Sequence, residues 1–201
     1  MKTEIFAASD SERALTVLQK GGIAAFPTDT VYGLGALAFD NAAIESIYVA
    51  KGRPIEKAIP VLIADVDDLK LVCDAVPPMA RILAARFWPG PLTCVIPKKE
   101  TLPPAISATT TVAVRIPDHA VARALLRAAG AMAVTSANIS GQASPSTAQG
   151  VYDQLKGRIP LILDGGKTPG GVPSTLVDCT GKIPVIIRAG PISLAEILGV
   201  L

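Results

Sequence analysis

The sequence has few of the side chains on which common hydrolytic and metal-dependent chemistries depend. Its 201 residues include one histidine, His119, and three cysteines, Cys73, Cys94 and Cys179, without C-x-x-C spacing. A multi-histidine metal site is therefore excluded, and the cysteines indicate neither a structural zinc site nor a disulfide framework. No serine or cysteine elbow accompanies His119, so a nucleophilic triad is not indicated either. This cysteine usage is typical of a reducing cytoplasm.

Long apolar runs, aromatic side chains and an excess of either charge are also scarce. No apolar stretch reaches the about 18 residues that a membrane-spanning helix needs, and the N-terminal residues lack the apolar core of an export signal. Lysine and arginine number 19 against 17 acidic residues, and aromatic residues make up 4%. Bulk electrostatic binding of nucleic acid or of an anionic membrane is therefore excluded, and any basic site must be local. We expect a cytoplasmic protein without a membrane partner.

Half of the residues are hydrophobic, which is enough for one buried core, and we expect a single domain over residues 1–201. Apolar periodicity predicts strands at 23–26, 59–63, 92–96, 112–116, 132–134, 161–163, 176–177 and 185–187. Helices are predicted to begin at Ser9, Asp40, Asp65, Pro77, His119, Thr147 and Ser193, with capping boxes at the first and the last. The last strands follow one another across short turns, so the sheet should be mixed and the fold α/β.

Two segments that follow predicted strands are rich in small polar residues. Residues 26–35 read FPTDTVYGLG and residues 135–141 read TSANISG, and both are expected to be loops. Threonine, serine and asparagine satisfy their own backbone at strand ends, which gives a capped turn as one interpretation. The other interpretation is a ligand site, because ligands of α/β proteins gather where strands end.

A cluster of cations follows the second predicted helix. Lys51, Arg53 and Lys57 lie within seven residues, with Pro54 directly after the arginine. Favourable pairing with the helix dipole is one explanation, and it contributes about 0.3–1 kcal/mol per charge. A clamp for phosphate or carboxylate is the other, because arginine offers two parallel donors and lysine a mobile charge.

Two arginines end predicted apolar strands and need anionic partners there. Arg115 lies in the last two residues of the strand predicted at 112–116, and Arg188 follows the strand at 185–187. The partner of each is either an internal carboxylate or an anionic ligand that the two share with the Lys51 cluster. By contrast, residues 164–168, DGGKT, are not a P-loop, because Leu161 occupies the first glycine position and Pro169 prevents the helix that must follow. A flexible loop is expected over 164–175.

Seven segments together resemble the YrdC/Sua family of threonylcarbamoyl-AMP synthases. In chain order they are PTDTVYGLG, KGRP, FWPGPLT, TVAVRIPDH, TSANISG, GVPST and IIRAGP, and the resemblance spans roughly residues 8–195. It implies a single YrdC-like domain with a twisted mixed sheet flanked by helices and a concave, positively charged face. Longer members add a second domain, and this sequence is similar to the short, single-domain form.

The resemblance also implies an activity. Family members join L-threonine, bicarbonate and ATP into threonylcarbamoyl-AMP and pyrophosphate, with Mg²⁺ carried by the ATP. A separate transferase complex then moves the threonylcarbamoyl group to tRNA, onto the adenosine beside the anticodon. A positive concave face is also compatible with weak RNA binding.

The site residues that the resemblance implies fall into three groups. The catalytic signature is Lys51, Arg53, Ser136 and Asn138. The threonine contacts are Thr30, Arg115, the backbone of Val134 and Ser174. The ATP contacts are Arg53, Lys57, Thr111, Ser136, Ser144 and Arg188. This sequence departs from some members, which have asparagine in place of Lys57 and histidine in place of Leu62, so Leu62 is assigned no role.

Two other functions compete with this interpretation. A double-stranded RNA-binding module is the main alternative, although the net charge of +2 and the 4% of aromatic residues provide neither a strong basic footprint nor a stacking platform. A carbamoyl-transfer domain of a hydrogenase maturation protein is the other. Those chains carry acylphosphatase and zinc-finger regions, which three scattered cysteines in 201 residues do not supply.

Overall fold

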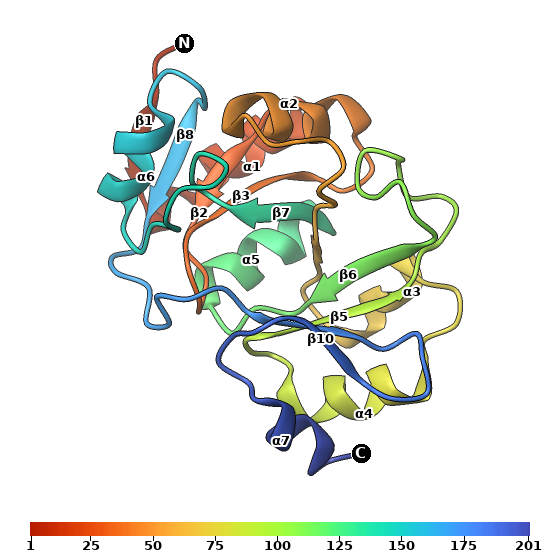
Figure 1. Ribbon diagram of the computed structural model, residues 1–201. Coiled ribbons are helices and arrows are strands. Elements are labelled where there is room, and N and C mark those ends of the chain that lie inside the picture. The colour runs from red at the N-terminus through yellow and green to blue at the C-terminus, as the bar shows by residue number, and fades with distance from the viewer.

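A mixed sheet of ten strands runs through the whole molecule (Figure 1), and the computed structural model describes all residues, 1–201. The strands are β1 (Glu4–Ala7), β2 (Ala24–Phe26), β3 (Gly33–Leu37), β4 (Val61–Leu62), β5 (Leu92–Pro97), β6 (Thr111–Arg115), β7 (Met132–Ser136), β8 (Leu161–Asp164), β9 (Thr175–Asp178) and β10 (Val185–Arg188). The α-helices are α1 (Ser11–Gln19), α2 (Asn41–Lys51), α3 (Leu69–Val72), α4 (Pro78–Phe87), α5 (Ala120–Ala129), α6 (Ala148–Leu155) and α7 (Leu194–Leu198). Short 3₁₀ helices precede α1 and α3 at Ala8–Asp10 and Val66–Asp68.

The strand order is β1-β8-β2-β3-β7-β4-β6-β5-β9-β10. The sheet contains parallel pairs, such as β2 with β8 and β5 with β9, and antiparallel pairs, such as β3 with β7 and β5 with β6. The prediction of a mixed sheet in an α/β fold is therefore confirmed. In Figure 1 the N-terminus lies at the end that carries β1, and α4 and α7 lie together at the other end.

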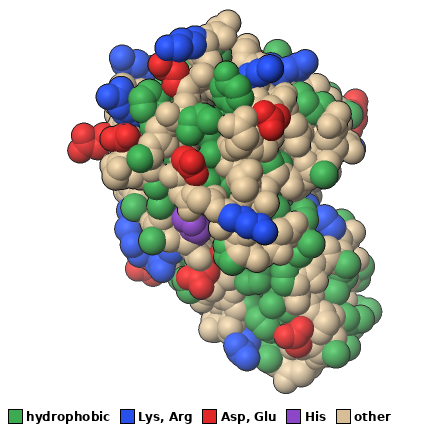
Figure 2. All heavy atoms as spheres, turned by 90° about the vertical axis from the view of Figure 1, so that its left-hand side faces the viewer, with side chains coloured by type: hydrophobic (Ala, Val, Ile, Leu, Met, Phe, Trp, Pro, Cys, Tyr) green, Lys and Arg blue, Asp and Glu red, His purple; other side chains and the backbone are tan.

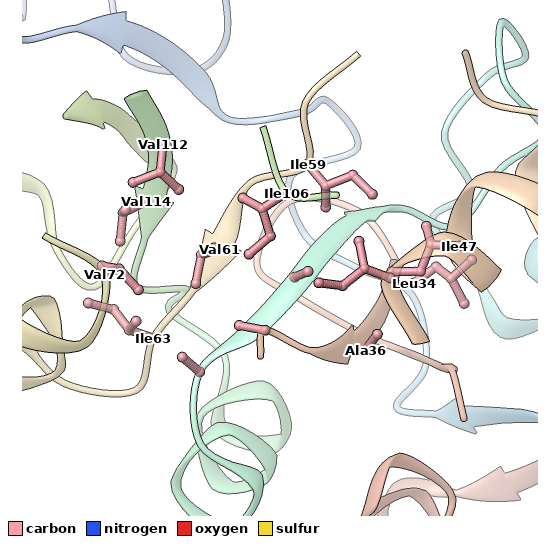
Figure 3. Packing of buried hydrophobic residues seen from close by; sticks show 14 of the residues in the cluster. Leu34, Ala36, Ile47, Ile59, Val61, Ile63, Val72, Ile106, Val112 and Val114 are labelled. Atoms are coloured by element: carbon pink, nitrogen blue, oxygen red, sulfur yellow. The ribbon is translucent and has the colours of Figure 1, made fainter. Parts of the chain in front are cut away.

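Alternation along the strands divides the core between the two faces of the sheet. On one face Leu34 and Ala36 of β3 pack with Ile47 of α2 and with Val61 of β4 (Figure 3). On the other face Phe26 of β2 and neighbouring strand residues pack against α1 and α5 in a smaller apolar cluster.

Helices cover only one half of the second face of the sheet. Helices α1 and α5 pack on it at its β1–β7 half. On β5, β6, β9 and β10 the residues with the same orientation, Val95, Ala113, Leu176 and Ile187, line a cavity instead. Their sequence neighbours Cys94, Val114 and Val177 point into the larger core. The uncovered half of this face is thus the floor of the cavity.

Capping residues in the sequence correctly predicted where most of the helices begin. Asp40 accepts a hydrogen bond from the Ala43 N–H at 3.0 Å, and Ser193 and Glu196 form a complete capping box. The capping box predicted at Ser9 was wrong, because α1 has Asp10 at its N-cap and no side-chain cap. All three cysteines are buried and free. None of the helices is long and apolar enough to cross a lipid bilayer.

The sequence prediction missed β1 and β3. The last three residues of the expected loop at 26–35 belong to strand β3, which pairs with both β2 and β7. A Cβ at Gly33 would lie 2.7 Å from the Val134 side chain, and one at Gly35 would lie 2.8 Å from that of Met132. These glycines are therefore explained by close packing within the sheet, where side chains of the neighbouring strand lean over them.

Candidate functional site

One cavity of about 390 Å³ opens above the uncovered half of the sheet. Its walls come from the segment before β3, the turn at 53–58, the end of β7 and the segment before β9. Of the twelve residues that the sequence resemblance singled out, eight line it: Thr30, Arg53, Thr111, Arg115, Val134, Ser136, Ser174 and Arg188. Lys51, Lys57, Asn138 and Ser144 do not line it.

Arg115 stands at the C-terminal end of β6 with its guanidinium group fixed on three sides. Its Nε donates to the Gly90 carbonyl at 2.9 Å, its Nη1 donates to Thr30 Oγ1 at 3.0 Å, and its Nη2 pairs with the Asp29 carboxylate. The side chains of Arg115 and Asp29 are only 6% and 11% exposed. Burial lowers the pKa of Arg115 from its ordinary value, and Asp29 opposes this shift. Arg115 therefore has an internal counter-ion, and each Nη retains one N–H for a ligand.

Arg188 stands at the end of β10 without a carboxylate partner. Its Nε and Nη2 donate to the Ser174 carbonyl at 3.2 and 2.8 Å, and Nη2 also donates to Ser174 Oγ at 3.2 Å. Burial lowers the pKa of Arg188, and the positive charges of Arg115 and Arg53 act in the same direction. Three guanidinium groups thus interact within one cavity, and this concentration of positive charge favours an anionic ligand.

Arg53 shapes the turn that follows α2. Its Nε donates to the Lys57 carbonyl at 3.0 Å and its Nη2 to the Ala58 carbonyl at 2.8 Å, and it has no ion-pair partner. The Lys57 side chain is exposed and does not line the cavity. Lys57 contributes to this turn through its backbone carbonyl.

Lys51 is buried behind the cavity wall. Its side chain is 1% exposed, and its Nζ donates to the carbonyl oxygens of Ser136 and Asn138 and to Asn138 Oδ1. Burial lowers the pKa of Lys51 to about 7, and the charge of Arg53 acts in the same direction. Through these hydrogen bonds, Lys51 and Asn138 fix the turn after β7 from behind the cavity wall. The three cations considered as one clamp do not converge, since only Arg53 lines the cavity.

The loop at 164–174 lies closed on the segment before β3. Its Gly170 and Gly171 N–H groups donate to the carbonyls of Asp29 and Thr30 at 3.1 and 2.8 Å. A Cβ at Gly170 would lie 2.7 Å from the Asp29 carbonyl oxygen, so the two backbones approach too closely for any side chain there.

Tyr32 anchors the beginning of this loop. Its hydroxyl donates to the Gly166 carbonyl at 2.7 Å and accepts from the Gly165 N–H at 3.2 Å. Burial raises the pKa of Tyr32 to about 12.

Sequence reasoning missed three residues of this site. Asp29, Tyr32 and Thr93 lay within the quoted segments PTDTVYGLG and FWPGPLT but were assigned no role. Thr93 has the same orientation on β5 as Val95, so strand alternation was the signal that could have placed it in the cavity.

The cavity has few carboxylate groups that could bind a metal ion. Glu56 is the one acidic residue that lines the cavity, and no three His, Cys, Asp or Glu side chains cluster anywhere as a metal site would require. The chain thus offers no carboxylate cage of the kind that holds a resident Mg²⁺.

The comparisons with known proteins agree on one family. The family model described as Sua5_yciO_yrdC, telomere recombination, matches residues 16–190. A threonylcarbamoyl-AMP synthase of Pyrococcus abyssi is 45% identical over 182 residues, which cover 90% of this chain and 54% of that relative. A threonylcarbamoyl-AMP synthase of Chromobacterium violaceum is 36% identical over 169 residues, which cover 83% of this chain and 87% of that relative.

The fold agrees with a solved structure of the same kind. The crystal structure of P. abyssi Sua5 complexed with L-threonine matches with a TM-score of 0.93 at 42% identity, over 100% of this chain and 59% of that one. The present chain therefore spans little more than half the length of the P. abyssi proteins that it matches.

Proposed function

This chain belongs to the Sua5/YciO/YrdC family, and on that premise we propose that it is a threonylcarbamoyl-AMP synthase. It joins L-threonine, bicarbonate and MgATP into threonylcarbamoyl-AMP and releases pyrophosphate. The product passes in the cytoplasm to a transferase complex that modifies tRNA next to the anticodon. The relatives named above carry the name of this activity, and the cavity supplies the chemistry that it needs.

The proposal rests on one observation: three guanidinium groups line the same cavity, and only one of them has a carboxylate partner within the protein. Arg115 is paired with Asp29, whereas Arg53 and Arg188 have no carboxylate partner. The substrates bring one amino-acid carboxylate and one triphosphate, which are the anions that guanidinium groups bind with two parallel hydrogen bonds. We assign the carboxylate to Arg115, and we assign the phosphates to Arg53 and Arg188.

The reaction needs no nucleophile from the protein. The threonine amine adds to the carbon of bicarbonate, water leaves, and a carbamate results. A carbamate oxygen then attacks the α-phosphorus of ATP, and pyrophosphate leaves with its bond electrons. The protein must align the two reactants and place positive charge where the phosphorus and the leaving group gather negative charge. Mg²⁺ bound to the triphosphate shares that charge.

Of the other residues that the sequence resemblance singled out, some line the cavity and some do not. Ser136, Thr111, Thr30 and Ser174 place hydroxyl groups in the lining of the cavity, and Val134 lines it too, so we assign these residues the substrate contacts that the sequence resemblance implied. Lys51 and Asn138 support the proposed reaction by holding Ser136 in place. Lys57 and Ser144 lie outside the lining, so their contacts to ATP require movement of their loops.

The face drawn in Figure 2 gives the RNA-binding alternative no support. Lysine, arginine and acidic side chains are interspersed over the face drawn in Figure 2, without a continuous basic area. Such an area is the footprint that double-stranded RNA requires.

Pyrophosphate release tests the proposed function. Purified protein is incubated with MgATP alone, and then with L-threonine or bicarbonate added singly and together. Rapid release that requires both additions supports the synthase. Release that is unchanged when threonine is omitted contradicts it, and salt-sensitive retention of double-stranded RNA without such release favours the alternative.

A further inference from the structure

Thr93 carries a buried hydroxyl group that the proposed reaction has not yet used. It lies on β5, between Leu92 and Cys94, which point into the core, and its own side chain faces the cavity. The side chain is 1% exposed. Its hydroxyl has one hydrogen-bond partner in the protein, Ser174 Oγ, at 2.7 Å. Ser174 also lines the cavity and is 5% exposed.

Arg188 restricts what Ser174 can do with this contact. A guanidinium group only donates, so the bond from Arg188 Nη2 to Ser174 Oγ fills one of the two lone pairs of the serine oxygen. Two further bonds from Arg188 to the Ser174 carbonyl hold the residue in place. One lone pair and one proton of the Ser174 hydroxyl remain to be assigned.

The direction of the bond between Thr93 and Ser174 decides that assignment. If Ser174 donates, the proton left without a protein acceptor is that of Thr93, whose side chain is 1% exposed. If Thr93 donates, both lone pairs of Ser174 are filled and the Ser174 proton is free. This arrangement leaves the free proton on the more exposed of the two residues, and because Ser174 lines the cavity, an acceptor oxygen of a ligand there can receive it.

We infer that Thr93 is a positioning residue for threonine binding, an inference that rests on the proposed function. By donating to Ser174 it makes Ser174 a donor toward the bound amino acid rather than an acceptor. A carboxylate only accepts hydrogen bonds, so this polarity suits the carboxylate that Arg115 binds. Thr93 acts through Ser174 and needs no contact with the substrate.

Three single variants separate this role from a structural one. Thr93→Val removes the hydroxyl and keeps the branched shape, Thr93→Ser keeps the hydroxyl, and Thr3→Val is the matched control. Thr3 is another buried threonine whose hydroxyl is hydrogen-bonded, to the Ile159 carbonyl and from the Gly157 N–H, and it does not line the cavity. Calorimetric titration with L-threonine gives the dissociation constant, and thermal unfolding gives the stability of each variant.

The expected result is an increase in the threonine Kd of about 10-fold for Thr93→Val, the effect of one hydrogen bond to a charged group. Thr93→Ser should bind within about 2-fold of the unmodified protein, at the precision of such additivity arguments. Thr3→Val should lose stability and bind threonine normally. In steady-state assays Thr93→Val should raise the KM for threonine more than the KM for MgATP.

A double-mutant cycle provides the strictest test. If Thr93 acts through Ser174, adding Thr93→Val to Ser174→Ala should cause no further loss of threonine affinity. Unchanged affinity in Thr93→Val, or losses that add in the double variant, would overturn the inference. Thr93→Ala removes the same hydroxyl and replaces Thr93→Val in the cycle if the valine variant does not fold. If the unmodified protein binds no threonine, the proposed function itself fails, which is a different result.

Discussion

Replacing Asp29 by asparagine should lower the free energy of unfolding, because the buried charge on Arg115 loses its counter-ion. The two side chains form an ion pair with exposures of 11% and 6%, and asparagine keeps the shape of the aspartate while removing its charge. The Arg115 guanidinium group would then have only neutral acceptors, namely the Gly90 carbonyl, the Thr30 hydroxyl and the amide oxygen of the new asparagine. Breaking a buried pair in this way costs about 3–5 kcal/mol, because a charge remains buried without compensation.

The chain contains a matched control for this substitution. Asp65 pairs with Arg123 and Arg127 at 2.7 and 2.9 Å, but its side chain is 47% exposed. Surface pairs of this kind contribute about 0–1 kcal/mol each. Asp65→Asn should therefore lower the free energy of unfolding much less than Asp29→Asn does, although Asp65 contacts two arginines.

Urea denaturation and thermal unfolding measure the difference. For a chain of this size about 1 kcal/mol corresponds to a Tm change of about 2–4 °C, so Asp29→Asn should lower the Tm by about 6–20 °C. L-Threonine should raise the Tm of Asp29→Asn by more than that of the unmodified protein, because its carboxylate supplies the lost counter-charge. L-Threoninol, which lacks the carboxylate, should not. Equal stability of Asp29→Asn and Asp65→Asn would refute the reasoning.

Three further substitutions test other parts of the site. Arg115→Lys keeps the charge but loses one of two parallel hydrogen bonds, so calorimetry should show threonine affinity falling about 10- to 100-fold with ATP affinity unchanged; equal losses for both ligands would contradict the assignment. Gly170→Ala places a Cβ 2.7 Å from the Asp29 carbonyl oxygen, so it should open the loop at 164–174, increase its proteolysis and lower kcat. Unchanged proteolysis and turnover would show that the reaction does not depend on this loop being closed. Burial raises the pKa of Tyr32 to about 12, so the stability held by its hydroxyl is present below the unfolded value of about 10 and is lost as the pH rises through 12. Tyr32→Phe should be less stable at neutral pH and should lose less stability than the unmodified protein over that window; parallel pH curves would show that the hydroxyl holds nothing.

The elements that sequence reasoning predicted correctly are those set by local chemistry. Apolar periodicity placed α2 and α5, and Asp40 and Thr147 cap helices as their positions predicted. Strand β3 was missed because Gly33 and Gly35 are typical of a loop, and their reason lies in side chains of β7, about one hundred residues away. Strand β1 was missed because it is a mostly exposed edge strand without clear apolar alternation.

In the site, too, the sequence could not predict contacts between residues that lie far apart in the chain. The sequence placed Arg115 and Arg188 at strand ends, but it could not pair Arg115 with Asp29, 86 residues away. Lys51 and Arg53 are two residues apart, and the sequence grouped them into one cluster. The helix ends between them at Gly52, whose φ of 58° is left-handed, and the chain turns there. Lys51 consequently enters the core while Arg53 reaches the cavity.

The fate of labelled bicarbonate tests the central claim most directly. The protein is incubated with MgATP, L-threonine and ¹³C-bicarbonate, and the nucleotide products are separated rapidly and examined by mass spectrometry. The claim predicts an adenylate that contains threonine and one ¹³C atom and that forms in equal amount with pyrophosphate. ATP consumption that yields no adenylate carrying both threonine and the label would contradict it.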